Sequence, residues 1–204
     1  MTTKNVIVML CTLFVLTGCV ALITPKVESS FTQLKAGDYV LDPSHASVVF
    51  KVKHLGLSNY VGRFNTVAAS LSFDPSNIAA SALDAVIDID SLDINDPSLK
   101  NDLMGGTWFD QARFPQARFS TVSVTSVSES EYDYVGNLEF RGVTKPITFR
   151  VTFLGGANNM LTGKYTLGFS ARAQFNRSDF GMDAYIPLVG DEVQIEAEAE
   201  FQRN

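Results

Sequence analysis

The chain has 204 residues, of which 46% are hydrophobic, so it is long and apolar enough for one domain with a core of its own. Its formal net charge of −6 argues against binding to nucleic acid, because an acidic surface repels phosphate backbones. Cys11 and Cys19 are its two cysteines, and removal of a leader that contains Cys11 would exclude an internal disulfide.

The first 18 residues are predicted to be a lipoprotein signal peptide. Lys4 precedes an apolar run over residues 6–16, as in a secretory leader. The small residues Thr17 and Gly18 before Cys19 match a lipobox, in which Cys19 becomes the lipidated first residue of the mature chain. Two alternatives stay open: an uncleaved anchor over residues 6–23, which just reaches membrane-spanning length, and ordinary cleavage that leaves a free thiol.

These features predict a protein of the cell envelope. Val20 stands where an aspartate would resemble an inner-membrane retention signal, so we expect a lipoprotein that faces the periplasm from the inner leaflet of the outer membrane. Residues 19–37 mix polar residues, Pro and Gly without periodicity and predict a lipidated N-terminus and tether. Because no basic patch is evident, membrane attachment is expected to depend on lipidated Cys19.

Residues 38–204 predict one domain built almost entirely of strands. Apolar residues alternate with polar ones in the manner of half-buried strands. The alternating segments start near residues 48, 67, 83, 117, 147, 161 and 193. Turn signals separate them, including Asp74-Pro75, Arg141-Gly142 and the run 155–159. Only residues 96–104 favour a helix, with Asp96 as the cap, Pro97 at the first position and Gly105 at the end. The fold class is therefore all-β, a single antiparallel barrel of about eight strands with one short helix.

The inward side chains of such a barrel decide its function. Large residues such as Phe50 and Phe149 alternate with small ones such as Ala85 and Ala197. Taken alone, this pattern favours a packed core, but it also fits an open channel. No pair of inward carboxylates and no nucleophile motif is evident, so no catalytic residue is predicted.

The two histidines of the chain are candidate metal ligands. His45 and His54 are nine residues apart, which places them on opposite faces of one continuous strand, so no metal site is predicted. The position of His45 next to Asp42 predicts a structural role at a turn. His54 shares the inward face of Val48, Phe50 and Val52, either as a satisfied core histidine or as a contact to a ligand headgroup.

Three segments stand out by their order and spacing. They read HASVVFKVKHLG at 45–56, FRGVTKP at 140–146 and FNRSDFG at 175–181. The third favours a loop in which Asp179 pairs with Arg177 or with nearby backbone, placed either at a structural turn or at the barrel mouth. Together the segments resemble the YceI-like family of bacterial polyisoprenoid-binding proteins over residues 38–203. The chain departs from the family at 100–109, where a His-containing stretch before two phenylalanines is more usual.

The resemblance implies a lipocalin-like barrel whose apolar tunnel holds an isoprenoid quinone or polyprenyl lipid, with no cofactor besides that ligand. Ligand contacts are expected from inward and lid residues: Phe50, Val52, His54, Phe64, Ile87, Ile89, Met104, Trp108, Phe109, Phe119, Phe149 and Phe169.

Two other functions stay open: a scavenger of hydrophobic toxins or antibiotics, and a filled barrel that serves as an interaction platform. The sequence also leaves open whether the chain forms a homodimer.

Overall fold

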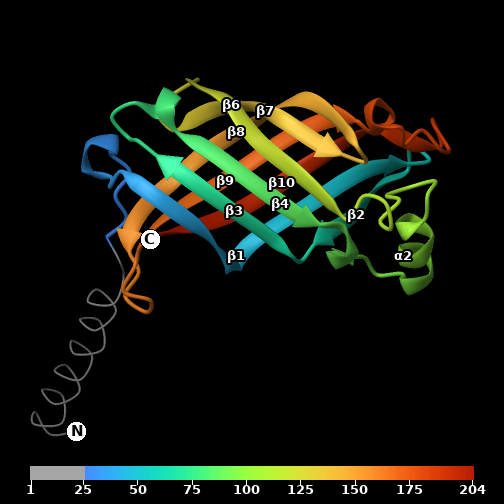
Figure 1. Cartoon of the computed structure of the whole chain (residues 1–204), viewed down its shortest axis with the longest axis horizontal. Helices are drawn as coiled ribbons and strands as arrows, with labels where there is room; N and C mark the ends of the chain where they lie inside the picture. The colour runs from blue at the N-terminus through green and yellow to red at the C-terminus, as the bar shows by residue number, and fades with distance from the viewer. Residues whose placement is uncertain (1–25) are drawn as a thin grey trace, which may run out of the picture.

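Eight antiparallel strands close into a barrel in the computed structural model, which describes residues 26–204 (Figure 1). Each strand pairs with its neighbours in the ring, and β10 pairs with β1 to close it, which confirms the predicted fold. In order around the barrel the strands are β1 (Gly37–His54), β3 (Val67–Phe73), β4 (Ala82–Asp88), β6 (Gln116–Ser126), β7 (Glu131–Phe140), β8 (Val143–Asn158), β9 (Tyr165–Asn176) and β10 (Val189–Arg203).

Short elements extend the barrel at one end. β2 (Ser58–Phe64) pairs with the second half of β1, and β5 (Leu92–Asp93) pairs with β2. Four 3-10 helices complete the structure: η1 (Phe31–Gln33), η2 (Ile78–Ala80), η3 (Ile89–Ser91) and η4 (Arg177–Phe180).

The α-helix α2 (Pro97–Met104) forms as predicted. The Asp96 carboxylate accepts hydrogen bonds from the backbone N–H groups of Ser98 and Leu99, Pro97 starts the helix, and Gly105 ends it. No helix within residues 26–204 is both long enough and apolar enough to cross a membrane.

The alternation of inward and outward residues holds along most strands, with two corrections. A bulge in β6 between Thr121 and Ser123 shifts the register, so Val124 is buried and Ser123 is exposed. Leu161, placed by the sequence in the long strand, instead lies in the β8–β9 turn with 97% of its surface exposed.

The predicted turn at 155–159 is also corrected. β8 runs on through Gly155 and Gly156 to Asn158, with a bulge between Phe153 and Gly155. Gly155 has a φ of +141°, and a Cβ there would lie 2.2 Å from the side chain of Val27. The glycines therefore mark a place where another segment approaches the strand, and the turn comes later.

That other segment belongs to the stretch predicted as a tether. Glu28 and Gly156 exchange two backbone hydrogen bonds of 2.8 and 2.9 Å. Phe31 follows, with its ring centre 5.2 Å from that of Phe153 and 5.5 Å from that of Tyr132. Leu34 is buried beside them. Residues 28–34 thus form part of the barrel end, and the tether prediction is wrong for them, because Phe31 and Leu34 supply apolar surface that the barrel covers.

The interior divides into two halves along the barrel. The half next to η1 is filled by aromatic rings, and the Phe169 ring contacts those of Phe73, Phe153 and Phe201. The half next to α2 has its own cluster around Phe50, Phe64, Phe109, Phe140 and Phe180. The packed core and the open channel that the sequence left as alternatives are therefore both present, in different halves.

Candidate functional site

A cavity of about 420 Å³ occupies the half of the barrel next to α2. This volume lies within the range of small-molecule sites. Most of its lining comes from inward positions of β1, β6, β7, β9 and β10, together with α2 and the segment after it. The apolar lining residues are Val48, Phe50, Val52, Phe64, Ile87, Ile89, Leu99, Leu103, Phe109, Ala117, Leu138, Phe140, Phe149, Phe175, Met182, Val189, Val193 and Ile195.

The only polar or amphipathic side chains in the lining, among the described residues, are His54, Tyr60, Trp108 and Arg177. His54 is exposed, and Tyr60 and Trp108 are half-buried. Because these exposed and half-buried side chains line the cavity, the cavity opens to solvent beside them. We call this opening the mouth. The arrangement is an apolar chamber with polar groups confined to its entrance.

A smaller space of about 150 Å³ continues toward the aromatic half. Both spaces are lined by Val48, Ile87, Ala117, Leu138, Phe149 and Ile195. The rings of Phe119 and Phe149 meet edge to face with their centres 5.0 Å apart. We therefore describe one lumen that narrows inward and ends at the aromatic cluster.

The predicted ligand contacts largely gather around this lumen. The larger cavity is lined by Phe50, Val52, His54, Phe64, Ile87, Ile89, Trp108, Phe109 and Phe149. Phe119 and Phe169 line the smaller space. Met104 lines neither and packs on the core from outside, which corrects its assignment, since it is the last residue of α2 and the inward face of that helix is provided by Leu99 and Leu103.

His54 keeps the inward parity expected from its strand but is solvent-exposed. Its pairing with Ser58 of β2 stays in register, whereas the pairing of β1 with β10 shifts between Val52 and His54. His54 is the last residue of β1, so its side chain lies at the mouth, where both the cavity and solvent reach it.

Arg177 lies at the mouth, which was one of the two places expected for its loop, but the sequence did not place it among the residues that line the cavity. It is 2% exposed and donates four hydrogen bonds to backbone carbonyls, from Nε to Gly190, from Nη1 to Met182, and from Nη2 to Ala184 and Val189, at 2.7–2.9 Å. Burial lowers its pKa, while the charges of Asp191 and Asp183 act in the opposite direction. The guanidinium thereby fixes the loop 181–190 that forms one wall of the mouth.

The expected pair of Asp179 with Arg177 does not form. Asp191 takes the structural role instead, since its carboxylate accepts hydrogen bonds from the backbone N–H and the hydroxyl of Ser178, at 2.9 and 2.7 Å. Gly181 adopts a φ of +71°, as the sequence suggested. The only signal that could have identified Arg177 was its position directly after an inward strand, because its acceptors are backbone atoms.

A second arginine connects two of the three motifs and the segment after α2. Arg141, in the turn after β7, donates to the carbonyl oxygens of Gly181 and Gly106. Gly181 belongs to the third motif, and Gly106 follows α2. His54 from the first motif lies at the same end, so the three segments that are distant in sequence meet at the mouth.

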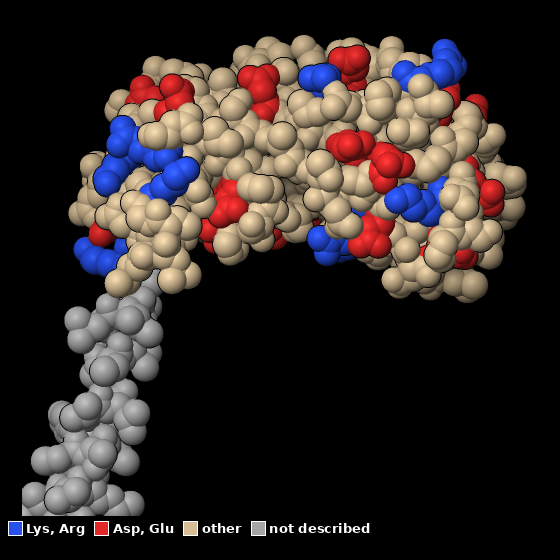
Figure 2. All heavy atoms as spheres, turned by 60° about the horizontal axis from the view of Figure 1, so that its bottom comes forward, with Lys and Arg blue, Asp and Glu red and all other residues tan. Residues whose placement is uncertain are grey.

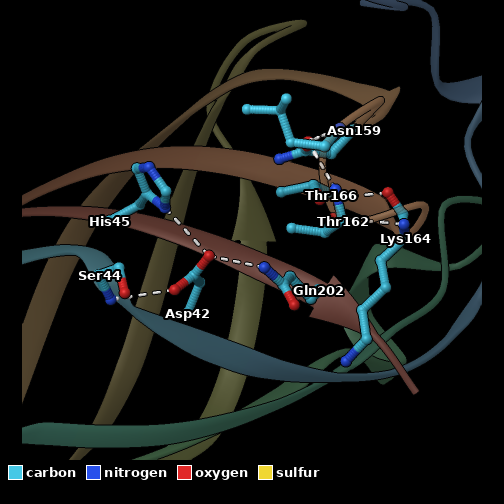
Figure 3. Close-up of polar contacts among 9 residues, drawn as sticks. Asp42, Ser44, His45, Asn159, Thr162, Lys164, Thr166 and Gln202 are labelled. Carbon is cyan, nitrogen blue, oxygen red and sulfur yellow. Dashed lines mark hydrogen bonds and ion pairs between the residues drawn. The ribbon is translucent and has the colours of Figure 1, made fainter.

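A polar cluster on the outer surface surrounds His45 (Figure 3). The His45 ring Nδ1 lies 3.0 Å from Asp42, whose carboxylate also accepts from the Ser44 N–H and from the Gln202 side chain. The hydrogen bond to Asp42, followed by the charge of Glu200, raises the pKa of His45, and the same bond lowers the pKa of Asp42.

The ligand atoms of Asp42, His45 and Glu200 lie within 4.8 Å of one another, so this group could hold a metal ion. The Asp42 oxygens are already hydrogen-bonded across the irregular register between β1 and β10. His45 therefore has a structural role, as expected, but it lies within β1 at this irregularity and not at a turn.

Comparison with known proteins is consistent with this geometry. Residues 39–201 match the model of the YceI-like domain. A UPF0312 protein of Vibrio parahaemolyticus is 35% identical over 170 residues, which cover 82% of this chain and 87% of that protein. A UPF0312 protein of Yersinia pestis is 35% identical over 162 residues, covering 78% and 83%.

Solved structures share the barrel. Burkholderia cenocepacia BcnA superposes with a TM-score of 0.71 at 25% identity, covering 78% of this chain and 98% of BcnA. The Campylobacter jejuni YCEI protein gives 0.67 at 27% identity, covering 76% and 91%. A polyisoprenoid-binding domain from Saccharophagus degradans gives 0.64 at 14% identity, covering 83% and 100%, and at that identity the likeness concerns the fold.

Proposed function

Because this chain belongs to the YceI-like family and its barrel contains an apolar lumen, we propose that it binds a long isoprenoid lipid, such as a quinone or polyprenyl compound, without altering it chemically. The observation that carries this proposal is the lining of the 420 Å³ cavity, which is apolar except at the mouth.

The shape of the lumen suits a molecule with a polar head and a flexible apolar tail. Apolar burial stabilises by roughly 25 cal/mol per Å² and needs no directional partner, so a tail gains affinity along its length. The headgroup would lie at the mouth, near His54, Tyr60 and Trp108. The name of the Saccharophagus domain, a polyisoprenoid-binding domain with the same fold, supports this class of ligand.

Binding is favoured over catalysis by the chemistry of the lining. Among the described residues that surround the larger cavity, none is an acid, a serine or a cysteine. Nucleophilic catalysis requires a nucleophile close to the reacting atoms, and the lining groups that could transfer a proton, His54 and Tyr60, lie only at the mouth. A ligand recovered in altered form would therefore contradict the proposal.

We further propose that the protein works in the cell envelope, attached through lipidated Cys19 to the periplasmic face of the outer membrane. Cys19 and the leader lie outside the described residues, so this part rests on the lipobox in the sequence. Cys19→Ala is expected to release the protein from membranes, or to leave an uncleaved precursor, without changing the barrel.

The direct test of ligand binding is native mass spectrometry, with organic extraction, of protein purified from its own host. A prenyl lipid should co-purify, and the delipidated protein should take up a prenyl quinone and return it unchanged. Empty protein that fails to take up a prenyl quinone would refute the proposal.

A variant pair on one strand makes the test specific to the lumen. Ile195 lines both spaces, and Ile195→Trp is expected to fill the narrow part and abolish uptake. Gln194 is exposed on the outer face of β10, so Gln194→Trp adds the same side chain outside the barrel and should leave uptake intact. Thermal unfolding of both variants reports whether the barrel is retained.

A further inference from the structure

The narrow inner part of the lumen contains a buried polar side chain, Tyr134. This residue lies on β7, across from Val124 of β6 and Phe149 of β8. Phe149 lines both the larger cavity and the smaller space of about 150 Å³, whereas Tyr134 lines only the smaller space. Tyr134 therefore lies on the inner side of the point where the lumen narrows, and it is separate from the polar groups of the mouth.

The other polar residues beside the smaller space belong to the outer surface of the barrel. Ser47 and Glu198 are partners at outward positions of β1 and β10, and Arg118 of β6 is exposed. Figure 2 shows charged side chains scattered over the outer surface of the molecule. Among the described residues, Tyr134 is therefore the polar side chain that the narrow part of the lumen encloses.

The Tyr134 hydroxyl makes no hydrogen bond within residues 26–204, although the residue is only 3% exposed. By contrast, the hydroxyl of Tyr132, on the same face of β7, donates to the Glu129 carbonyl. Tyr165 is the tyrosine in the described part of the chain whose hydroxyl is fully enclosed without a partner, so the Tyr134 hydroxyl keeps some accessible surface. Most buried polar atoms in proteins have a partner, and the lack of one is unfavourable.

The Tyr134 hydroxyl is a hydrogen-bond donor at neutral pH. Burial, followed by the interaction with Tyr132, raises the pKa of Tyr134 to about 12, so the phenol keeps its proton. The side chains that share the lining of the smaller space from inward positions are aliphatic or phenylalanine side chains, which contain no oxygen or nitrogen acceptor. An acceptor for this proton therefore has to come from the molecule that occupies the lumen.

We infer that the inner end of the lumen is a hydrogen-bonding subsite, in which the Tyr134 hydroxyl donates to an oxygen atom on the tail of the bound lipid. The inference rests on the proposed function and narrows its ligand class to a prenyl compound that carries oxygen near the end of its tail as well as in its headgroup. A hydroxyl or carbonyl oxygen is unfavourable in an apolar lumen unless it finds a partner. Tyr134 would therefore favour tails that place an oxygen beside it.

Two ligands and two proteins measure what the hydroxyl contributes. Full-length, delipidated wild type and Tyr134→Phe, which removes only the hydroxyl, are each titrated with a prenyl quinone and with the same quinone hydroxylated at the end of its chain. The titrations are repeated at several chain lengths. For each protein the measured quantity is the Kd of the hydroxylated quinone divided by the Kd of the unmodified quinone.

This ratio should be about ten-fold higher in Tyr134→Phe than in the wild type, because the hydroxylated tail then lies in the lumen without a partner. The difference should be largest at the chain length that brings the two hydroxyls together. Equal ratios in both proteins at every length would overturn the inference alone, and a water molecule bound to Tyr134 would give that result. Uptake of neither quinone by the wild type would refute the proposed function together with the inference.

Tyr132→Phe is the matched control. Tyr132 is 6% exposed, lines neither space, and its hydroxyl already has a partner in the Glu129 carbonyl at 3.1 Å. The ratio should therefore stay at its wild-type value in Tyr132→Phe, and an equal rise in both variants would contradict a specific role of Tyr134. Thermal unfolding of the two variants reports whether the barrel is retained.

A second measurement needs no variant. Wild type is titrated with two isomeric quinones, one with a ketone at the end of its chain and one with the ketone in the middle. A ketone accepts a hydrogen bond but donates none, so the isomer that places it beside Tyr134 should bind about ten-fold more tightly. Equal affinities of the two isomers across the same chain lengths would overturn the assignment of Tyr134 as the donor.

Discussion

The guanidinium carbon of Arg177 lies 5.4 Å from the ring centre of Trp108, whose other neighbour, Tyr185, stacks on it at 5.9 Å and 15°. Trp108 follows α2, whereas Arg177 and Tyr185 come from η4 and the loop after it. The contact therefore connects two walls of the mouth, and a cation on the face of an indole ring is a favourable contact.

Arg177→Lys is expected to lower the free energy of unfolding by about 3 kcal/mol or more and to loosen the mouth. A lysine cannot reproduce four fixed hydrogen bonds to carbonyls, and the unpaired carbonyls would remain partly buried. Denaturant unfolding measures the loss, and hydrogen exchange of the 181–190 amides measures the loosening. Arg172→Lys is the control, because Arg172 is exposed on β9 and should cost little; equal losses in both variants would contradict the assignment.

Gly62 allows the Phe50 ring to lie against β2. A Cβ at Gly62 would lie 2.4 Å from the end of that ring and 2.9 Å from Ile94. Gly62→Ala is therefore expected to push Phe50 into the lumen, at a cost of about 1–3 kcal/mol in stability, and to weaken ligand uptake. Gly106→Ala, where a Cβ meets open space, should change neither property in the same unfolding and uptake assays.

Phe31 fixes the N-terminal segment on the barrel end. Phe31→Ala is expected to cost about 2–3 kcal/mol, less than the ~3–5 kcal/mol of a fully buried phenylalanine, because the residue is only half-buried. Urea unfolding gives the value, with the exposed neighbour change Thr32→Ala as the control. A cost near zero would restore the tether interpretation for residues 28–34.

Ligand affinity should depend on tail length. Each five-carbon unit removed is expected to cost roughly 1–2 kcal/mol, reduced by the entropy of ordering the tail, until the tail no longer fills the lumen. Titration with a series of prenyl quinones measures this slope. His54→Gln should change the preference among headgroups and leave the slope intact, since His54 lies only at the mouth; a flat series would show that the tail lies outside the lumen.

The His45–Asp42 contact should make stability depend on pH. The pKa of His45 is raised on folding, so its contribution is complete below the unfolded value of about 6.5 and is lost as the pH rises through the folded pKa. The pKa of Asp42 is lowered, so its contribution is lost only as the pH falls below about 4 toward the folded value.

The stability difference between wild type and His45→Gln should therefore shrink between pH 6 and pH 8.5. Thermal unfolding at several pH values measures it. The effect will be small, because more than half of the His45 side chain is exposed to solvent. A difference that grows with pH would contradict the assigned sign.

Most of the fold could be predicted from the sequence, because strand alternation reports which face each residue takes and the signals at Asp96, Pro97 and Gly105 are local. The same alternation identified the inward side chains that surround the lumen. It failed at the β6 bulge and at Gly155, where one extra residue or an approaching segment changes the local pairing without a change in composition.

Only the tertiary structure decided which half of the barrel is hollow. Phe31 and Leu34 enter from a segment without periodicity and help to fill one end, while Gly62 lets Phe50 lie close to the wall at the other. The volume of a cavity depends on the combined size of side chains from strands and loops that are distant in sequence. A local sequence pattern cannot report that combined size. For the same reason the sequence predicted a loop at Arg177, but only the tertiary structure brought the four backbone carbonyls that accept its hydrogen bonds together around it.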